Sequence, residues 1–180
     1  SNLRKKQWIH IYGKMFTGKT QTLIRIAEHV ASYIWITAKV SEFQYINVKE
    51  LDLQEDTVVF IDGIPNMSNP KIKEKCLQIL SECKEKKSKL ITTGYEDAEV
   101  YVKGFVKSEE LVSVELSGFS ADEINEIMKK HNAPEGLLRT KGYHNFVELC
   151  KGLPPIVMEV VHRMETNGWK YDDDVFMTII

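Results

Sequence analysis

Residues 13–20 read Gly-Lys-Met-Phe-Thr-Gly-Lys-Thr, a complete G-x-x-x-x-G-K-[ST] pattern. The β-prone run 8–12 precedes these residues, and a helical repeat of apolar residues begins at Lys19. In a loop between a strand and a helix, two glycines let successive backbone N–H groups turn inwards, and the helix N-terminus adds partial positive charge. This arrangement favours a polyphosphate, so the stretch predicts a strand–loop–helix unit that binds a nucleotide.

The side chains of this loop have distinct expected roles. Lys19 is expected to reach the β- and γ-phosphates and to act in catalysis, and Thr20 is expected to offer its hydroxyl to Mg²⁺. The alternative is that this stretch is a glycine-containing turn that binds no ligand. The predicted nucleotide contacts extend over the loop and the first helical turn, namely Gly13, Lys14, Met15, Phe16, Thr17, Gly18, Lys19, Thr20 and Gln21.

An acidic residue follows the buried run Val58–Ile61 directly. Asp62 would therefore lie at the carboxyl end of a strand, beside the phosphate loop. An acid at this place holds Mg²⁺, usually through a water molecule, and completes the ligand set begun by Thr20. The sequence thus predicts metal binding by Thr20 and Asp62 and a catalytic role for Asp62. The alternative is that Asp-Gly is only a turn dipeptide.

Two further groups of residues bear on the rate of ATP hydrolysis, namely the threonines that end the fourth apolar run and any acids that follow it or Asp62. Thr92 and Thr93 end the fourth apolar run, where one hydroxyl could sense the γ-phosphate; Thr93 is the predicted site residue, and strand propensity alone is the alternative. Residues 63–67 contain no acid that could orient the attacking water, and Glu96 and Asp97 are either substitutes or surface residues. Because general base assistance is worth about 10²–10⁴-fold, we expect slow Mg²⁺-dependent hydrolysis of ATP or none.

The wider pattern predicts an α/β fold with a helical appendage. Strand-like runs alternate with helical patterns in the first two-thirds of the chain, which indicates a parallel sheet with right-handed crossovers. We expect an α/β nucleotide-binding domain over residues 1–116 and a small helical subdomain over residues 117–180, with a solvated turn at Asp172–Asp174. The expected strands are 8–12, 33–37, 57–61, 90–93 and 111–116, and the expected helices are 19–31, one from Asn69-Pro70, one capped by Ser120, 143–150 and one from Pro154.

Composition narrows the environment and the partners. The chain has 180 residues, 24 Lys and Arg against 26 Asp and Glu, and a net charge of −2, which disfavours a surface made mainly for nucleic acid or anionic lipid. Its three cysteines form no disulfide framework, because Cys76 and Cys83 are too far apart along one helix to pair. No apolar run reaches the 18 residues that a membrane span needs, and no signal peptide is evident. We expect a cytoplasmic protein without a membrane partner.

Several of these motifs together resemble the signal-transduction ATPases with numerous domains (STAND). The phosphate loop, the Val58–Gly63 strand end, Leu90–Thr93 and Gly152-Leu153-Pro154-Pro155 carry the resemblance, which spans about residues 8–165. It implies a three-layer sheet in the order 5-1-4-3-2 and a nucleotide between sheet and subdomain, with Leu153 and Pro154 against the adenine. It also implies an ADP/ATP switch that opens and oligomerises with ATP, between flanking effector and sensor domains.

The sequence departs from the pattern of that family at two places, and two other functions remain open as alternatives. Gly94 stands where plant members have an arginine after the two threonines, and Pro65-Asn66 replaces paired acids. A replication helicase or related AAA-like hexameric ATPase would need a basic pore and an arginine finger, and a small-molecule kinase would need an arginine-rich lid. The chain has only four arginines, which disfavours both alternatives: Arg4, Arg25, Arg139 and Arg163.

Overall fold

The computed structural model describes residues 6–39 and 41–170 of the chain. These residues divide into two compact units, Ser1–Leu116 and Ser117–Ile180. The turn expected at Asp172–Asp174 lies outside the described residues. No helix in the described ranges is both long and apolar enough to cross a bilayer.

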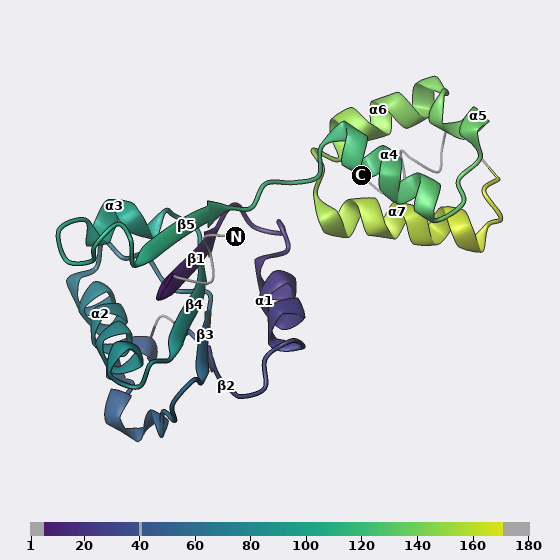
Figure 1. Ribbon diagram of the computed structural model, residues 1–180. Coiled ribbons are helices and arrows are strands. Elements are labelled where there is room, and N and C mark those ends of the chain that lie inside the picture. The colour runs from purple at the N-terminus through teal and green to yellow at the C-terminus, as the bar shows by residue number, and fades with distance from the viewer. Residues whose placement is uncertain (1–5, 40, 171–180) are drawn as a thin grey trace. The chain divides into compact units, whose positions relative to one another are not determined.

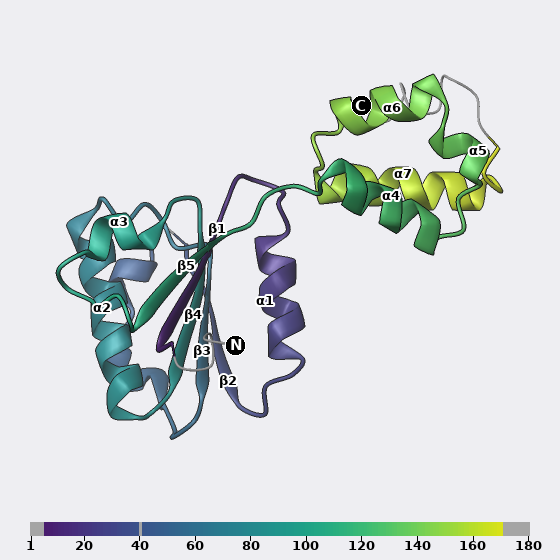
Figure 2. The same cartoon turned by 45° about the horizontal axis from the view of Figure 1, so that its top comes forward.

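The first unit is built on a five-stranded parallel sheet with helices on both faces. Its order is β2-β3-β4-β1-β5, which is the expected order 5-1-4-3-2 read from the other edge. Figures 1 and 2 show α1 on one face of the sheet and α2 and α3 on the other. The elements are β1 Trp8–Tyr12, α1 Lys19–Ala27, β2 Tyr33–Thr37, β3 Val58–Asp62, α2 Pro70–Glu85, β4 Lys89–Gly94, α3 Ala98–Val102 and β5 Leu111–Glu115.

The side chains of each strand alternate between two apolar cores. Phe60 and Ile91 pack towards α1 with Leu23, whereas Ile61 and Leu90 belong to the core on the α2 face. This alternation follows from the pleat of a strand. The apolar stripe predicted for α2 is confirmed, because all five of its members are buried: Ile72, Cys76, Ile79, Leu80 and Cys83. All three cysteines are free and buried, as expected.

Some element boundaries and burial expectations were wrong. The helix from Lys19 ends at Ala27 rather than Ala31. The amides of His29 and Val30 donate to carbonyl oxygens three residues back instead of four, so the α-helical pattern does not continue. The nearly continuous apolar run 33–37 predicts a strand buried on both faces, but β2 lies at the sheet edge and is only partly buried. The sequence pattern also missed α3 and two short 3₁₀ turns, η2 Phe43–Tyr45 and η3 Val48–Leu51.

The described part of the second unit, up to residue 170, contains four helices, α4 Ala121–Lys130, α5 Glu135–Leu138, α6 Lys141–Leu149 and α7 Pro154–Thr166. The capping box predicted for α4 is confirmed: the Ser120 hydroxyl accepts from the Glu123 amide, and Glu123 accepts in return. Gly152 precedes α7 and meets the chain at Phe119 so closely that an added Cβ would lie 2.0 Å from the Phe119 carbonyl oxygen. Only glycine therefore fits there, which fixes where α7 starts.

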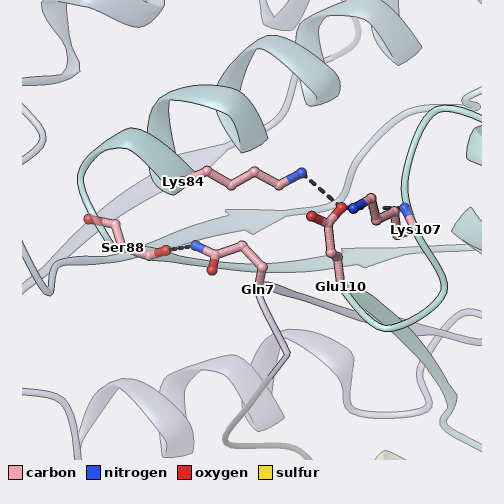
Figure 3. A network of polar contacts seen from close by, with 5 residues as sticks. All are labelled: Gln7, Lys84, Ser88, Lys107 and Glu110. Atoms are coloured by element: carbon pink, nitrogen blue, oxygen red, sulfur yellow. Dashed lines mark hydrogen bonds and ion pairs between the residues drawn. The ribbon is translucent and has the colours of Figure 1, made fainter.

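A polar network joins the elements at the amino-terminal end of the sheet (Figure 3). The Gln7 side chain donates to the Ser88 carbonyl oxygen, and the Lys84 ammonium donates to the Glu110 carboxylate at 2.8 Å. The backbone amide of Lys107 donates to the same carboxylate at 3.3 Å. The Lys84 hydrogen bond holds the pKa of the Glu110 carboxyl below its ordinary value of 4.5. This end of the sheet is thus tied together by groups that satisfy one another.

Candidate nucleotide-binding site

The phosphate loop leaves β1 at Tyr12 and enters α1 at Lys19, at the carboxyl end of the sheet. Gly13 has φ +154°, and a Cβ there would lie 2.3 Å from the Leu116 carbonyl oxygen, so the chain leaving β5 requires glycine at this position. Gly18 has φ +88° and is the N-cap of α1. The Thr17 hydroxyl is buried and donates to the Lys14 carbonyl oxygen at 2.9 Å, which holds the loop curled.

The N-terminus of α1 suits an anion. Its N-cap Gly18 offers no side-chain acceptor to the first amides, and the first turn contains no acid. Helix N-termini leave unpaired N–H groups and partial positive charge, which stabilise a phosphate. The side chains of Met15 and Phe16 are 60% and 66% exposed. Their predicted nucleotide contacts, like that of the exposed Gln21, stay predictions.

Lys19 turns its ammonium back over the loop. Nζ donates to the carbonyl oxygens of Gly13 at 2.8 Å and Lys14 at 2.7 Å, and it lies 4.7 Å from the centroid of the Tyr95 ring. Partial burial lowers the pKa of Lys19, and the nearby Asp62 carboxylate opposes that shift. The ammonium that is expected to reach the β- and γ-phosphates thus lies over the loop.

Two of the predicted residues, Thr20 and Thr93, contact a third, Asp62. The Thr20 hydroxyl lies 2.9 and 3.0 Å from the two carboxylate oxygens of Asp62, and the Thr93 hydroxyl donates to Oδ1 at 2.7 Å. The amide of Gly63 donates to the Thr93 oxygen at 2.7 Å, which links the ends of β3 and β4. Carboxylate and hydroxyl oxygens are ligands that Mg²⁺ accepts.

Magnesium would need further ligands beside these two residues. Within residues 6–39 and 41–170, no group of three or more His, Cys, Asp or Glu side chains could hold a metal ion. Mg²⁺ is commonly bound by one or two protein oxygens together with substrate phosphates and water. The pairing of Thr20 with Asp62 fits that mode of binding.

Thr92 faces the other way and belongs to a buried chain of hydrogen bonds. Its oxygen accepts from Trp8 Nε1 at 2.8 Å and lies 2.7 Å from His10 Nδ1, while His10 Nε2 lies 2.9 Å from the Glu96 carbonyl oxygen. A carbonyl oxygen only accepts, so we assign the proton to Nε2 and infer that Nδ1 accepts from Thr92. Burial lowers the pKa of His10 to about 4, so the ring is neutral at pH 7.

The two acids considered as substitute bases have structural partners. The Glu96 carboxylate accepts from the Tyr101 hydroxyl at 2.7 Å. Asp97 caps α3 by accepting from the Glu99 amide at 2.9 Å. The structure therefore does not support the hypothesis that either carboxylate orients a water molecule.

A cavity of about 230 Å³ lies beside the ends of β3 and β4. Its lining is mostly apolar and includes His10, Met67, Tyr95 and Tyr101, but no residue of the loop 13–20. It is therefore distinct from the predicted polyphosphate site. Sequence reasoning missed His10 and Tyr95; a histidine in the middle of an apolar strand was the one signal that could have found the first of them.

Leu153 and Pro154 belong to the helical unit. Leu153 is the N-cap of α7, Pro154 is its first residue, and both are half-buried. Their contact with adenine stays a prediction.

No protein-family model and no curated protein matches the sequence. Among solved structures, a RuvB mutant from Thermotoga maritima has 16% identity and a TM-score of 0.61, and the match covers 99% of this chain and 63% of that one. Domain III of the replication initiation protein DnaA from Thermotoga maritima has 16% identity and a TM-score of 0.60, over 98% and 84%. The AAA domain of FIGL-1 in complex with ADP has 12% identity and a TM-score of 0.54, over 96% and 70%. The chain has the α/β fold of P-loop nucleoside triphosphatases.

Proposed function

We propose that the chain binds an adenine nucleotide with Mg²⁺ and serves as the core of an ATP/ADP switch of the STAND type. One observation carries this proposal: Lys19 lies over the phosphate loop, and Thr20, the last residue of the stretch 13–20, contacts Asp62 together with Thr93. The resemblance of the sequence motifs to that class supports the regulatory part. The fold is compatible with it.

Each residue has a defined part in this proposal. The loop amides and the α1 terminus would bind the phosphate oxygens, and Lys19 would donate to the β- and γ-phosphates. Thr20 and Asp62 would hold Mg²⁺, which supplies charge neutralisation on the phosphates. Thr93, in contact with both Asp62 and Gly63, would sense whether a γ-phosphate is present.

Hydrolysis would be slow or absent under this proposal. Residues 63–67 contain no acid, and Glu96 and Asp97 have other partners. Phosphate positioning and charge neutralisation remain, but a base to orient water is missing. We expect turnover below about 1 s⁻¹, the lower end of typical enzyme values.

The rest of the switch is inferred from the family resemblance. Leu153 and Pro154 would pack on the adenine, ADP would hold the protein closed, and ATP would open it to form homo-oligomers. Flanking effector and sensor domains would carry the signal, in the cytoplasm and without nucleic acid. The chain spans 63% of the RuvB chain that it matches.

Calorimetry with ADP and ATP, each with and without Mg²⁺, tests the proposal. We expect both nucleotides to bind, Mg²⁺ to strengthen ATP binding, and phosphate release to stay below about 1 s⁻¹. Leu153→Ala should weaken ADP binding and leave the binding of inorganic triphosphate unchanged, because the latter has no base. Absence of nucleotide binding would refute the proposal, and unchanged ADP affinity in Leu153→Ala would clear that residue of an adenine role.

A second candidate is an AAA-like ATPase of a replication protein. The likeness in fold to the DnaA domain is compatible with it. Against it, the three arginines in the described part of the chain each pair with a nearby glutamate: Arg25 with Glu28, Arg139 with Glu135 and Arg163 with Glu159. ATP turnover in the presence and absence of DNA separates the candidates, because only the second predicts stimulation.

A further inference from the structure

Tyr95 contacts the loop lysine without being a core residue. Its ring centroid lies 4.7 Å from Lys19 Nζ, and its side chain is 58% exposed. The ammonium has three N–H donors, of which the carbonyl oxygens of Gly13 and Lys14 take two. An aromatic ring within about 6 Å of a cation attracts it through the negative charge of the ring face. The Tyr95 ring is thus the third contact of this ammonium, beside its two hydrogen bonds to the loop.

The segment that carries Tyr95 is held on both sides. On one side, the Thr93 carbonyl oxygen accepts from the Ile64 amide at 2.7 Å. On the other, the Glu96 carbonyl oxygen accepts from His10 Nε2. The ring of His10 packs so closely under Gly94 that a Cβ there would lie 2.9 Å from His10 Cε1. The backbone on either side of Tyr95 is therefore fixed to Ile64, just after β3, and to His10 of β1.

An unrestrained lysine at this place would have a competing partner. Asp62 is close enough to shift the pKa of Lys19, and the same carboxylate receives the Thr20 and Thr93 hydroxyls. An ammonium drawn to Asp62 would occupy the oxygens that the metal needs. Holding Lys19 against the loop carbonyls keeps Asp62 accessible to its other partners.

We propose that Tyr95 is a positioning residue for Lys19. The face of the Tyr95 ring keeps the Lys19 ammonium beside the carbonyl oxygens of the phosphate loop. This inference rests on the proposed nucleotide binding and adds a residue to it. An exposed cation–π contact corresponds to about a two- to fivefold change in affinity. The aromatic ring is what matters, so phenylalanine should replace tyrosine without loss.

A double-mutant cycle on ADP and ATP affinity tests the proposal. Tyr95→Leu should weaken binding about two- to fivefold, Tyr95→Phe should not, and Tyr95→Leu should have no further effect in a Lys19→Ala background. The matched control is Phe105→Leu, because the Phe105 ring lies 4.8 Å from Lys73 Nζ and so loses the same type of contact elsewhere. Equal losses with and without Lys19, or equal losses in the Phe and Leu variants, would overturn the proposal.

A second measurement does not depend on nucleotide. In the free protein, the ε-methylene protons of Lys19 should show an upfield ring-current shift by NMR, which Tyr95→Leu removes and Tyr95→Phe keeps. No such shift would overturn the positioning role even if nucleotide binds. The upfield shift in a protein that binds no nucleotide would instead reject the proposed function and leave the contact itself confirmed.

Discussion

The two ends of the sheet use the same chemical groups for different purposes. At the amino end, the Lys84 ammonium is paired with the Glu110 carboxylate at 2.8 Å. At the carboxyl end, Lys19 and Asp62 form no such pair: the lysine donates to carbonyl oxygens of the loop, and the carboxylate accepts hydroxyl groups. A lysine and an acid that neutralise each other tie elements together, whereas a lysine and an acid held apart can bind a charged ligand and its metal.

The difference comes from the backbone rather than from the side chains. At the carboxyl end, glycines at 13 and 18 let the chain curl and expose amides and carbonyls around Lys19. At the amino end, Lys84 lies near the end of the long helix α2, and its ammonium donates to the Glu110 carboxylate.

The largest effect we expect is on stability in acid. His10 lies in the middle of β1, buried and neutral, with a pKa lowered from 6.5 to about 4. As the pH falls from 6.5 towards 4, the unfolded chain takes up a proton that the folded protein refuses, so about 3 kcal/mol of stability is lost. Denaturant unfolding at pH 7 and pH 4 measures this loss. His10→Gln cannot take up the proton and should lack this step; the same loss in both proteins would contradict the assignment.

Removal of either lysine separates the two ends by ligand affinity. Lys19→Ala should weaken ATP binding about 10- to 100-fold, because hydrogen bonds to charged groups are worth about 1.5–3 kcal/mol. Lys84→Ala removes the same charge at the other end and should leave ATP affinity unchanged. Titration calorimetry measures both. Equal losses would mean that net charge, and not the loop, binds the nucleotide.

The metal dependence of binding tests Asp62. Asp62→Asn keeps the shape of the side chain but removes its charge, so the gain in ATP affinity on adding Mg²⁺ should fall about tenfold, in the range seen when the surroundings of a metal are changed. Affinity for ADP without metal should not fall. Glu110→Gln is the matched control at the amino end. An unchanged magnesium effect in Asp62→Asn would remove that residue from the metal site.

The smallest effect concerns the amino-end pair. Lys84→Met should cost about 0.2–1 kcal/mol of stability, because the pair is partly exposed. The folded-state pKa of Glu110 is lowered, so its contribution is present above its ordinary pKa of 4.5 and is lost as the pH falls through the folded value. The pH dependence of wild type and Lys84→Met should therefore differ only below about pH 4.5. A difference at neutral pH above that range of energy would show that Lys84 has another role.

The sequence predicted the parts of the site that depend on local pattern. The loop 13–20 and Asp62 at the end of β3 agree with the structure because short-range periodicity and glycine spacing decide them. The strand order also agrees, but it is implied by the family resemblance and not by local pattern. The alternation of a strand indicates that Thr92 and Thr93 face opposite ways, but not which one faces Asp62. That depends on the packing of β4 between β1 and β3.

Contacts between distant segments could not be predicted. The hydrogen bond between His10 and Thr92 depends on the register of two strands that are 82 residues apart. The contact of Tyr95 with Lys19 depends on the loop before α3, a helix of only five residues with too few apolar positions to show a period. Nothing in the residue types of 94–97 indicates that this loop approaches the phosphate loop.

NMR of the amide groups during titration with MgADP tests the central claim most directly. We predict that the amides of residues 13–20 shift first and most, and that inorganic triphosphate moves the same signals. The amides of Lys84, Ser88 and Glu110 should stay in place. Large shifts at the amino end, or a phosphate loop whose amides do not respond to either ligand, would contradict the account.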